Sequence, residues 1–90
     1  RTADMLIKLG LEYFNLSDYT SAINFWNNVF DIDEKNTAAL NNIGTAFMMK
    51  LQYDDAISMF QQVIKLDPTN QLAKNNLAWA MDEKRKAGLK

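Results

Sequence analysis

The sequence predicts an all-α protein that is built from repeated pairs of helices. The 90 residues include one proline and three glycines, so little of the chain can form turns. The apolar residues are mainly Leu, Ile, Ala, Met and Phe, a set that favours helices over strands. In addition, residues 3–36 align with residues 37–70. Eight positions are identical in this alignment: Leu6/Leu40, Gly10/Gly44, Tyr19/Tyr53, Ala22/Ala56, Ile23/Ile57, Val29/Val63, Asp33/Asp67 and Asn36/Asn70.

The first unit contains two apolar stripes at helical spacing, and each stripe predicts one helix. In the first stripe, four residues at i, i+3, i+4 and i+7 share one helical face: Leu6, Leu9, Gly10 and Tyr13. A polar break follows at residues 15–18. The second stripe has residues at i, i+4, i+7 and i+8: Ala22, Trp26, Val29 and Phe30. We therefore expect helices over residues 3–15 and 19–32.

The second unit copies this pattern and predicts helices over residues 37–49 and 53–66. Its stripes are Leu40, Ile43, Gly44 and Phe47, followed by Ala56, Phe60, Val63 and Ile64. Small residues recur at fixed places in both units: Gly10, Ala22, Gly44 and Ala56. We expect them to let the paired helices approach closely, with the large rings filling the space on either side.

A third copy of the pattern begins at Gln71 and ends after Met81, without a second helix to complete it. The remaining residues, DEKRKAGLK, are polar. Arrays of helical repeats need a terminal helix whose outer face tolerates water. We therefore expect a capping helix over residues 71–86 that covers the last helix of the second unit with four residues: Ala73, Leu77, Ala78 and Met81.

Together these units resemble the tetratricopeptide repeat (TPR). The resemblance rests on the two sets of stripe residues, on Tyr19 and Tyr53, and on the turn LDPTN at 66–70, and it covers residues 3 to 81. It implies one domain over residues 1–90, with repeats at about 3–36 and 37–70 and a cap at about 71–86. These helices would form a short right-handed superhelix. The chain departs from the family at Glu34, where proline is favoured, and at Ser17 and Leu51, where glycine is usual.

The residue types present exclude most catalytic chemistry. Cysteine and histidine are both absent, which removes disulfides, imidazole metal sites and nucleophiles activated by histidine. The adjacent carboxylates of Asp54 and Asp55 would point about 100° apart on a helix, too far to share a substrate proton. The segment DIDEKN lacks the glycine and the bidentate glutamate of a calcium loop, because Asn36 and Asn42 stand there. We predict no enzyme, no metal and no cofactor.

The net charge and the hydropathy of the chain indicate what kind of molecule its partner is. The net charge is −1, and the basic run Lys84-Arg85-Lys86 is interpreted as a solvated helix end, where cations suit the helix dipole, rather than as a nucleic-acid contact. No segment approaches the eighteen apolar residues that would predict membrane insertion. The lack of cysteine assigns no compartment. We expect the partner to be another protein.

The family resemblance implies that the first helix of each unit lines a concave groove. We predict that this groove binds a peptide or helix of the partner through eleven residues: Ile7, Leu11, Phe14, Asn41, Asn42, Thr45, Met48, Met49, Asn75, Asn76 and Trp79. Methionines beside aromatic side chains suit an apolar segment. The alternative is a purely structural slice of a longer array, or a module that associates with itself.

Asn42 and Asn76 raise a further question, because asparagine is a poor helix former. One interpretation is an asparagine ladder, in which each amide donates to and accepts from the backbone of an extended peptide. The other is that asparagine is common at this place in the family, and the sequence leaves both open. Family members that clamp a chaperone's C-terminal carboxylate use a basic and Asn-containing cluster. The corresponding residues here are Ile7, Leu11, Asn42, Leu72 and Asn76, which argues against such a clamp.

Overall fold

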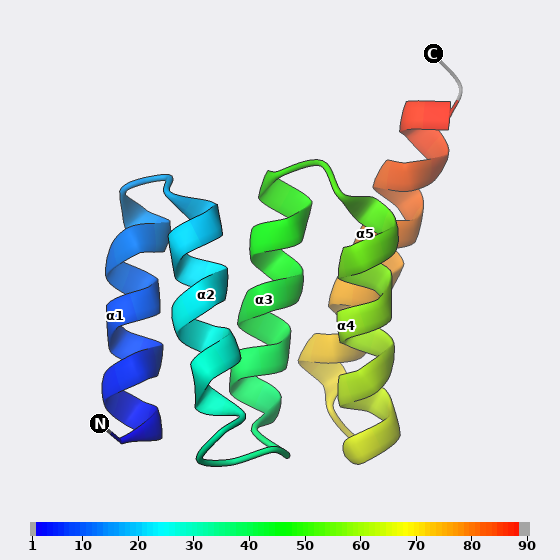
Figure 1. Cartoon of the computed structure of the whole chain (residues 1–90). Helices are drawn as coiled ribbons and strands as arrows, with labels where there is room; N and C mark the ends of the chain where they lie inside the picture. Colours follow the sequence, from blue (N-terminus) through cyan, green and yellow to red (C-terminus); the bar gives the residue numbers. More distant parts are fainter. Residues whose placement is uncertain (1, 89–90) are drawn as a thin grey trace.

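Five α-helices make up the part of the chain that the computed structural model describes, residues 2–88. They are α1 (Ala3–Asn15), α2 (Tyr19–Val29), α3 (Thr37–Met49), α4 (Tyr53–Leu66) and α5 (Gln71–Gly88). Each helix packs against the next along the chain, and Figure 1 shows α1 to α4 side by side with α5 partly behind α4. The all-α prediction is confirmed. The predicted domain 1–90 also includes residues 1 and 89–90, which lie outside the described residues.

The helix bounds agree with the prediction except at two ends. Helix α5 continues to Gly88 instead of ending at residue 86. Helix α2 ends at Val29 instead of residue 32, and the amide of Asp33 donates to the Val29 carbonyl at 2.8 Å as the chain turns away. The acidic side chain of Asp31 disfavours a helix C-terminus, where the dipole is negative. Helix α4, by contrast, carries Lys65 in its last turn and continues to its predicted end.

Four of the helices have a side-chain cap at their N-terminus, and two of these caps explain why asparagine occurs at the same place in both units. The Oδ1 atoms of Asn36 and Asn70 accept hydrogen bonds from the amides of Ala39 and Ala73, both at 2.9 Å. These bonds satisfy one of the free amides at the start of α3 and of α5. Thr2 caps α1 and Asp18 caps α2 in the same way. The identity of Asn36 and Asn70 in the two units therefore has a local cause.

The glycines of the two units lie directly under large rings. A Cβ added to Gly10 would overlap the indole of Trp26, and one added to Gly44 would overlap the ring of Phe60. Trp26 and Phe60 are 1% and 0% exposed, so each ring fills the space between its paired helices. Ala22 and Ala56 are fully buried as well. The close approach predicted from these small residues is present in both pairs.

The turns within the two helix pairs adopt a backbone conformation that favours glycine. Ser17 and Leu51 have φ values of 63° and 62°, in the left-handed region. A side chain with a Cβ is strained there, because the Cβ approaches the following carbonyl oxygen. Leu51 is also 69% exposed, so its side chain gains little from burial. Ser17 and Leu51 therefore adopt the turn conformation in which the family usually has glycine, and their backbone is strained there.

Helix α5 packs against α4 with only part of the predicted face, because two of the four predicted residues contact the core and two do not. Ala73 and Ala80 are buried and Leu77 is half-buried against the core, whereas Ala78 and Met81 are exposed. The contacting residues follow the spacing i, i+4, i+7, which turns Ala78 and Met81 away from α4. The prediction that these two residues cover α4 is therefore wrong. Among the described helices, none is both long and apolar enough to cross a membrane.

Candidate functional site

Four of the predicted groove residues meet at one small pocket between α1 and α3. The pocket is open to the surface, has a volume of about 90 Å³ and is lined by five residues: Leu11, Phe14, Trp26, Asn42 and Thr45. Leu11 and Phe14 are three positions apart on α1, as Asn42 and Thr45 are on α3, and such residues are neighbours on a helix surface. Thr45 occupies the place in the second unit that Leu11 occupies in the first. One position of the repeat therefore contributes a residue to the lining from each of the two units.

Trp26 forms part of this pocket, although the sequence predicted it only as a core residue. Its indole N–H donates a hydrogen bond to the carbonyl of Ile7 at 3.1 Å, which fixes the ring beneath α1. The ring of Phe14 lies between two other aromatic rings, with centroids 6.0 Å from Trp26 and 5.1 Å from Tyr19. The signal in the sequence was Gly10, whose missing side chain leaves room for the indole. The pocket therefore has an aromatic wall held in place by several contacts.

The remaining predicted residues lie outside the lining of this pocket. Ile7 is half-buried on α1, and Met49 at the end of α3 is 47% exposed. On α5, Asn76 is half-buried, whereas Asn75 and Trp79 are exposed, Trp79 by 41%. The Asn75 Oδ1 accepts a hydrogen bond from the side chain of Gln71 at 3.0 Å.

Two predicted groove residues are buried, and the structure corrects their placement. Met48 is 4% exposed and belongs to a core cluster with Ala56, Phe60 and Ala80. Asn41, seven residues earlier on the same side of α3, is 6% exposed, and its Oδ1 has no hydrogen-bond partner among the described residues. The reason is the central position of α3, which contacts α2, α4 and α5. A face that would be open on an isolated pair of helices is covered here.

None of the five residues that line the pocket carries a charge. Its polar groups are the amide of Asn42 and the hydroxyl of Thr45, and the Thr45 Oγ1 donates to the Asn41 carbonyl at 3.0 Å. The five positions of a carboxylate clamp carry only apolar and amide side chains, with Leu72 60% exposed. Such a surface can hydrogen-bond a peptide backbone and contact apolar side chains. It offers no cation to a terminal carboxylate.

The basic run at the end of α5 is paired with acidic side chains. Lys84 reaches Asp54 at 2.7 Å, Arg85 reaches Asp82 at 2.6 Å, and Lys86 lies 3.1 Å from Asp82. The hydrogen bond and the charge of Asp82 raise the pKa of Lys86, and those of Arg85 and Lys86 lower the pKa of Asp82. These interactions support the interpretation of the run as a solvated helix end. Within the described residues, no group of three His, Cys, Asp or Glu side chains could hold a metal.

Comparison with known families assigns both helix pairs to one type of repeat. Two models described as tetratricopeptide repeat match the chain, one over residues 3–36 and the other over residues 37–70. These ranges are the two units predicted from the internal alignment. A search for similar curated proteins found no match.

Solved structures share the fold at low sequence identity. The first TPR of Spaghetti (RPAP3) bound to the HSP90 peptide SRMEEVD has a TM-score of 0.89 and 22% identity, over 94% of this chain and 69% of that one. The Sgt2 TPR domain from Aspergillus fumigatus has 0.88 and 21%, over 93% of this chain and 56% of that one. The second TPR domain of human RPAP3 in complex with the HSP70 peptide SGPTIEEVD has 0.82 and 21%, over 89% and 67%. Identities this low support a common fold alone.

Proposed function

Because the chain belongs to the tetratricopeptide repeat family, we propose that it is a protein-interaction module whose groove face binds an apolar segment of a partner protein. By groove face we mean the exposed and half-buried predicted residues of α1, α3 and α5: Ile7, Leu11, Phe14, Asn42, Thr45, Met49, Asn75, Asn76 and Trp79. The observation that carries this proposal is the pocket in which Leu11 and Phe14 meet Asn42 and Thr45. The family is a non-catalytic one, so the work of the domain is binding.

The chemistry of the groove face favours a particular class of peptide. Apolar side chains of the partner would contact Leu11 and Phe14, as aromatic and aliphatic anchors do in protein interfaces. The amides of Asn42 and Asn76 would hold the partner's backbone, because an amide matches both groups of a peptide bond. The RPAP3 structures bind chaperone peptides that end in EEVD. A ligand with so many carboxylates would find no basic residue at Ile7, Leu11 or Leu72 here.

We also propose that residues 3–36, 37–70 and 71–86 act as one unit, with α5 as the cap. Ala73, Leu77 and Ala80 of α5 cover apolar residues of α3 and α4. Without α5, Met48 and Phe60 would lose neighbours in their cluster. Folding of the binding surface on α3 therefore depends on the cap.

A titration with defined peptides tests the proposed function. Peptides selected from a random display library on the immobilised domain would be compared with SRMEEVD. We expect the selected peptides to be rich in apolar residues and to bind at least tenfold more tightly than SRMEEVD. Tighter binding of SRMEEVD than of every selected peptide would contradict the proposal.

A matched pair of variants locates the binding surface. Leu11→Ala removes an exposed leucine that lines the pocket, and Leu16→Ala removes an exposed leucine from the turn after α1, outside it. We expect Leu11→Ala to weaken binding of the selected peptides about fivefold or more, and Leu16→Ala to leave it unchanged. Equal effects of the two changes would place the peptide elsewhere.

Self-association is a second candidate, favoured by one observation on α5. Three of its large apolar side chains are exposed: Leu72 by 60%, Trp79 by 41% and Met81 by 51%. A second copy of the chain could cover Leu72 and Trp79, which are seven positions apart and share one side of α5. Light scattering over a range of concentrations separates this candidate from the first, since a binding module of the proposed kind is a monomer without its ligand.

A further inference from the structure

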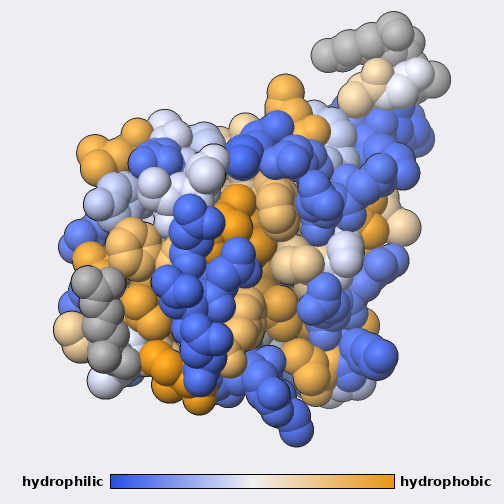
Figure 2. Space-filling view, viewed as in Figure 1, coloured by the Kyte–Doolittle hydropathy of each residue, from blue (hydrophilic) through white to orange (hydrophobic). Residues whose placement is uncertain are grey.

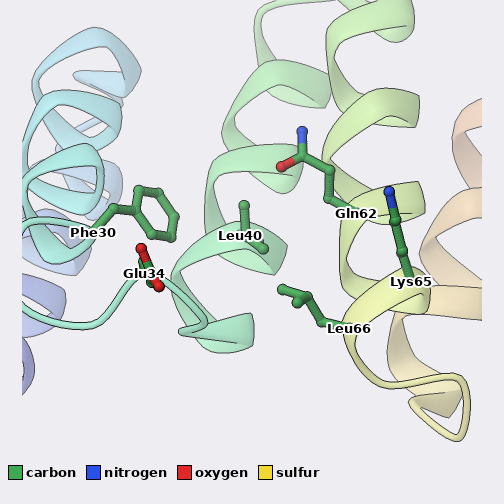
Figure 3. Close-up of a pocket in the computed structure, with 6 residues that line it drawn as sticks. All are labelled: Phe30, Glu34, Leu40, Gln62, Lys65 and Leu66. Atoms are coloured by element: carbon green, nitrogen blue, oxygen red, sulfur yellow. The ribbon is translucent and has the colours of Figure 1, made fainter.

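A second and larger pocket lies on a different side of α3 from the groove face. It is an open pocket of about 520 Å³ and is lined by six residues: Phe30, Glu34, Leu40, Gln62, Lys65 and Leu66. Figure 3 shows Phe30 and Glu34 on one side, Gln62, Lys65 and Leu66 of α4 on the other, and Leu40 of α3 between them. None of the six belongs to the groove face. On α3, Leu40 is about 160° around the helix from Asn42 and about 140° from Thr45, so the two pockets open in different directions.

The segment that follows the early end of α2 supplies one side of this pocket. Helix α4 continues to Leu66, but α2 stops at Val29, and the chain then turns through residues 30–36. Glu34 stands at the place that Pro68 occupies in the second unit. The turn places the ring of Phe30 and the carboxylate of Glu34 opposite the last turn of α4 (Figure 3). One side of the pocket therefore comes from a turn in which the two units differ in sequence.

The lining combines an apolar interior with charges of opposite sign at its edges. Phe30, Leu40 and Leu66 supply the apolar surface, and Figure 2 shows apolar side chains exposed between hydrophilic ones on this side of the molecule. Glu34 and Lys65 are exposed, and neither forms an ion pair with another described residue. An apolar centre with a charged rim is the usual anatomy of a protein interface. Because Glu34 and Lys65 lie on opposite sides of the pocket, an occupant that pairs with both needs a cation on one side and an anion on the other.

We infer that this pocket is a second docking site, which takes a segment of a partner protein with one large apolar side chain between a cationic and an anionic residue. The large side chain fills the space between Phe30, Leu40 and Leu66. The cation pairs with Glu34 and the anion pairs with Lys65. Because this site and the groove face share no residue, the domain can hold two partner segments at the same time.

Three blocked pentapeptides of defined charge test this inference: Arg-Gly-Trp-Gly-Glu, Arg-Gly-Trp-Gly-Arg and Glu-Gly-Trp-Gly-Glu. Binding is followed by chemical-shift changes of the main-chain amides in the full chain. We expect the peptide with one charge of each sign to bind most tightly, about twofold to fivefold over the other two, as one more exposed ion pair would give. The largest shifts should fall at Phe30, Leu40 and Leu66 rather than at Asn42 and Thr45. Replacing the peptide's tryptophan by alanine should abolish them.

Charge reversal at the rim provides the sharper test. Glu34→Lys makes both edges cationic and should transfer the preference to the peptide with two glutamates, whereas Lys65→Glu should transfer it to the peptide with two arginines. The matched controls are Glu12→Lys on α1 and Lys35→Glu beside the pocket, which make the same charge changes at exposed residues outside the lining.

The outcomes separate this site from the groove face. A preference that follows Glu34 and Lys65 but not the controls supports the inference, and the double change Asn42→Ala with Asn76→Ala should leave it intact. Three results would overturn it: no shifts with any of the peptides at millimolar concentration, a preference that ignores both charge reversals, or shifts confined to Asn42 and Thr45. Failure of the groove-face proposal would leave all of these results unaffected.

Discussion

The indole N–H of Trp26 donates a hydrogen bond to the carbonyl of Ile7 across the α1–α2 pair, at 3.1 Å. The ring lies against Gly10 and is 1% exposed, yet its edge lines the pocket between α1 and α3. One side chain therefore joins two helices and forms a wall of the candidate binding site. Changes under this ring should alter the stability of the fold and the shape of the pocket together.

Gly10→Ala should destabilise the protein although alanine is the better helix former. The new Cβ would overlap the indole of Trp26, and the ring cannot move away without breaking its bond to Ile7. We expect a loss of about 1–3 kcal/mol in the free energy of unfolding, measured by urea denaturation. Gly88→Ala is the control, because a Cβ there meets no atom within 4 Å and the change should stay within about 0.5 kcal/mol. Similar curves for the two variants would contradict the close packing at Gly10.

Met48 and Met49 are adjacent and should respond very differently to alanine. Met48 is 4% exposed in the cluster with Phe60, and Met49 is 47% exposed. Met48→Ala leaves a cavity in the core and should cost about 2–5 kcal/mol of unfolding free energy. Met49→Ala should cost less than about 0.5 kcal/mol. A small loss of stability for Met48→Ala would indicate that the Met48 side chain lies on the groove surface and not in the core.

Leu51→Gly should stabilise the protein, which is unusual for the loss of a leucine side chain. Leu51 has a φ of 62° and is 69% exposed, so glycine relieves strain and sacrifices little burial. The larger entropy of glycine in the unfolded chain offsets part of the gain, and we expect about 0.5–1 kcal/mol in a thermal melt. Lys50→Gly, at a φ of −87°, serves as the control and should stabilise nothing. A lower melting temperature for Leu51→Gly would show that its side chain makes contacts that matter.

Replacing both Asn42 and Asn76 by alanine should separate binding from stability. Both side chains are half-buried on the groove face, and alanine favours the helix. The melting temperature should stay near that of the wild type. Binding of a library-selected peptide should weaken by about 0.5–1.5 kcal/mol for each lost hydrogen bond in a calorimetric titration. A large drop in melting temperature would end the asparagine-ladder hypothesis.

Acid should destabilise the α1–α2 pair partly through Asp18. The hydroxyl and then the main-chain amide of Ser21 donate to its carboxylate and hold its pKa below the ordinary value of 3.8. Because the folded-state pKa is lowered, the stabilisation is complete well above pH 3.8 and is lost as the pH falls through the folded-state value. Asp18→Asn keeps a capping oxygen that does not titrate. Melts from pH 6 down to pH 2.5 should show a shallower decline for this variant than for the wild type, and parallel curves would contradict the effect.

The sequence by itself determined the helices and the repeat, because both depend on the pattern of residues along the chain. Apolar residues at helical spacing marked all five helices, and the match of residues 3–36 to 37–70 marked the repeat that the family models identify. Capping is equally local: Asn36 and Asn70, which are identical in the two units, cap the starts of α3 and α5. Gly10 and Gly44 indicated where large rings would pack.

Tertiary structure decided which of these helical faces remain open. Met48 and Asn41 fit the spacing of a groove face, but both are buried, and Ala80 of α5 joins the cluster around Met48. Periodicity along one helix carries no information about where a helix more than twenty residues later will lie. For the same reason the sequence did not predict the two pockets. The smaller one combines residues of α1, α2 and α3, including Trp26. The larger one combines Phe30 and Glu34, which follow α2, with residues of α3 and α4. Local spacing fixes the direction of each side chain, and packing between distant segments fixes whether water or protein meets it.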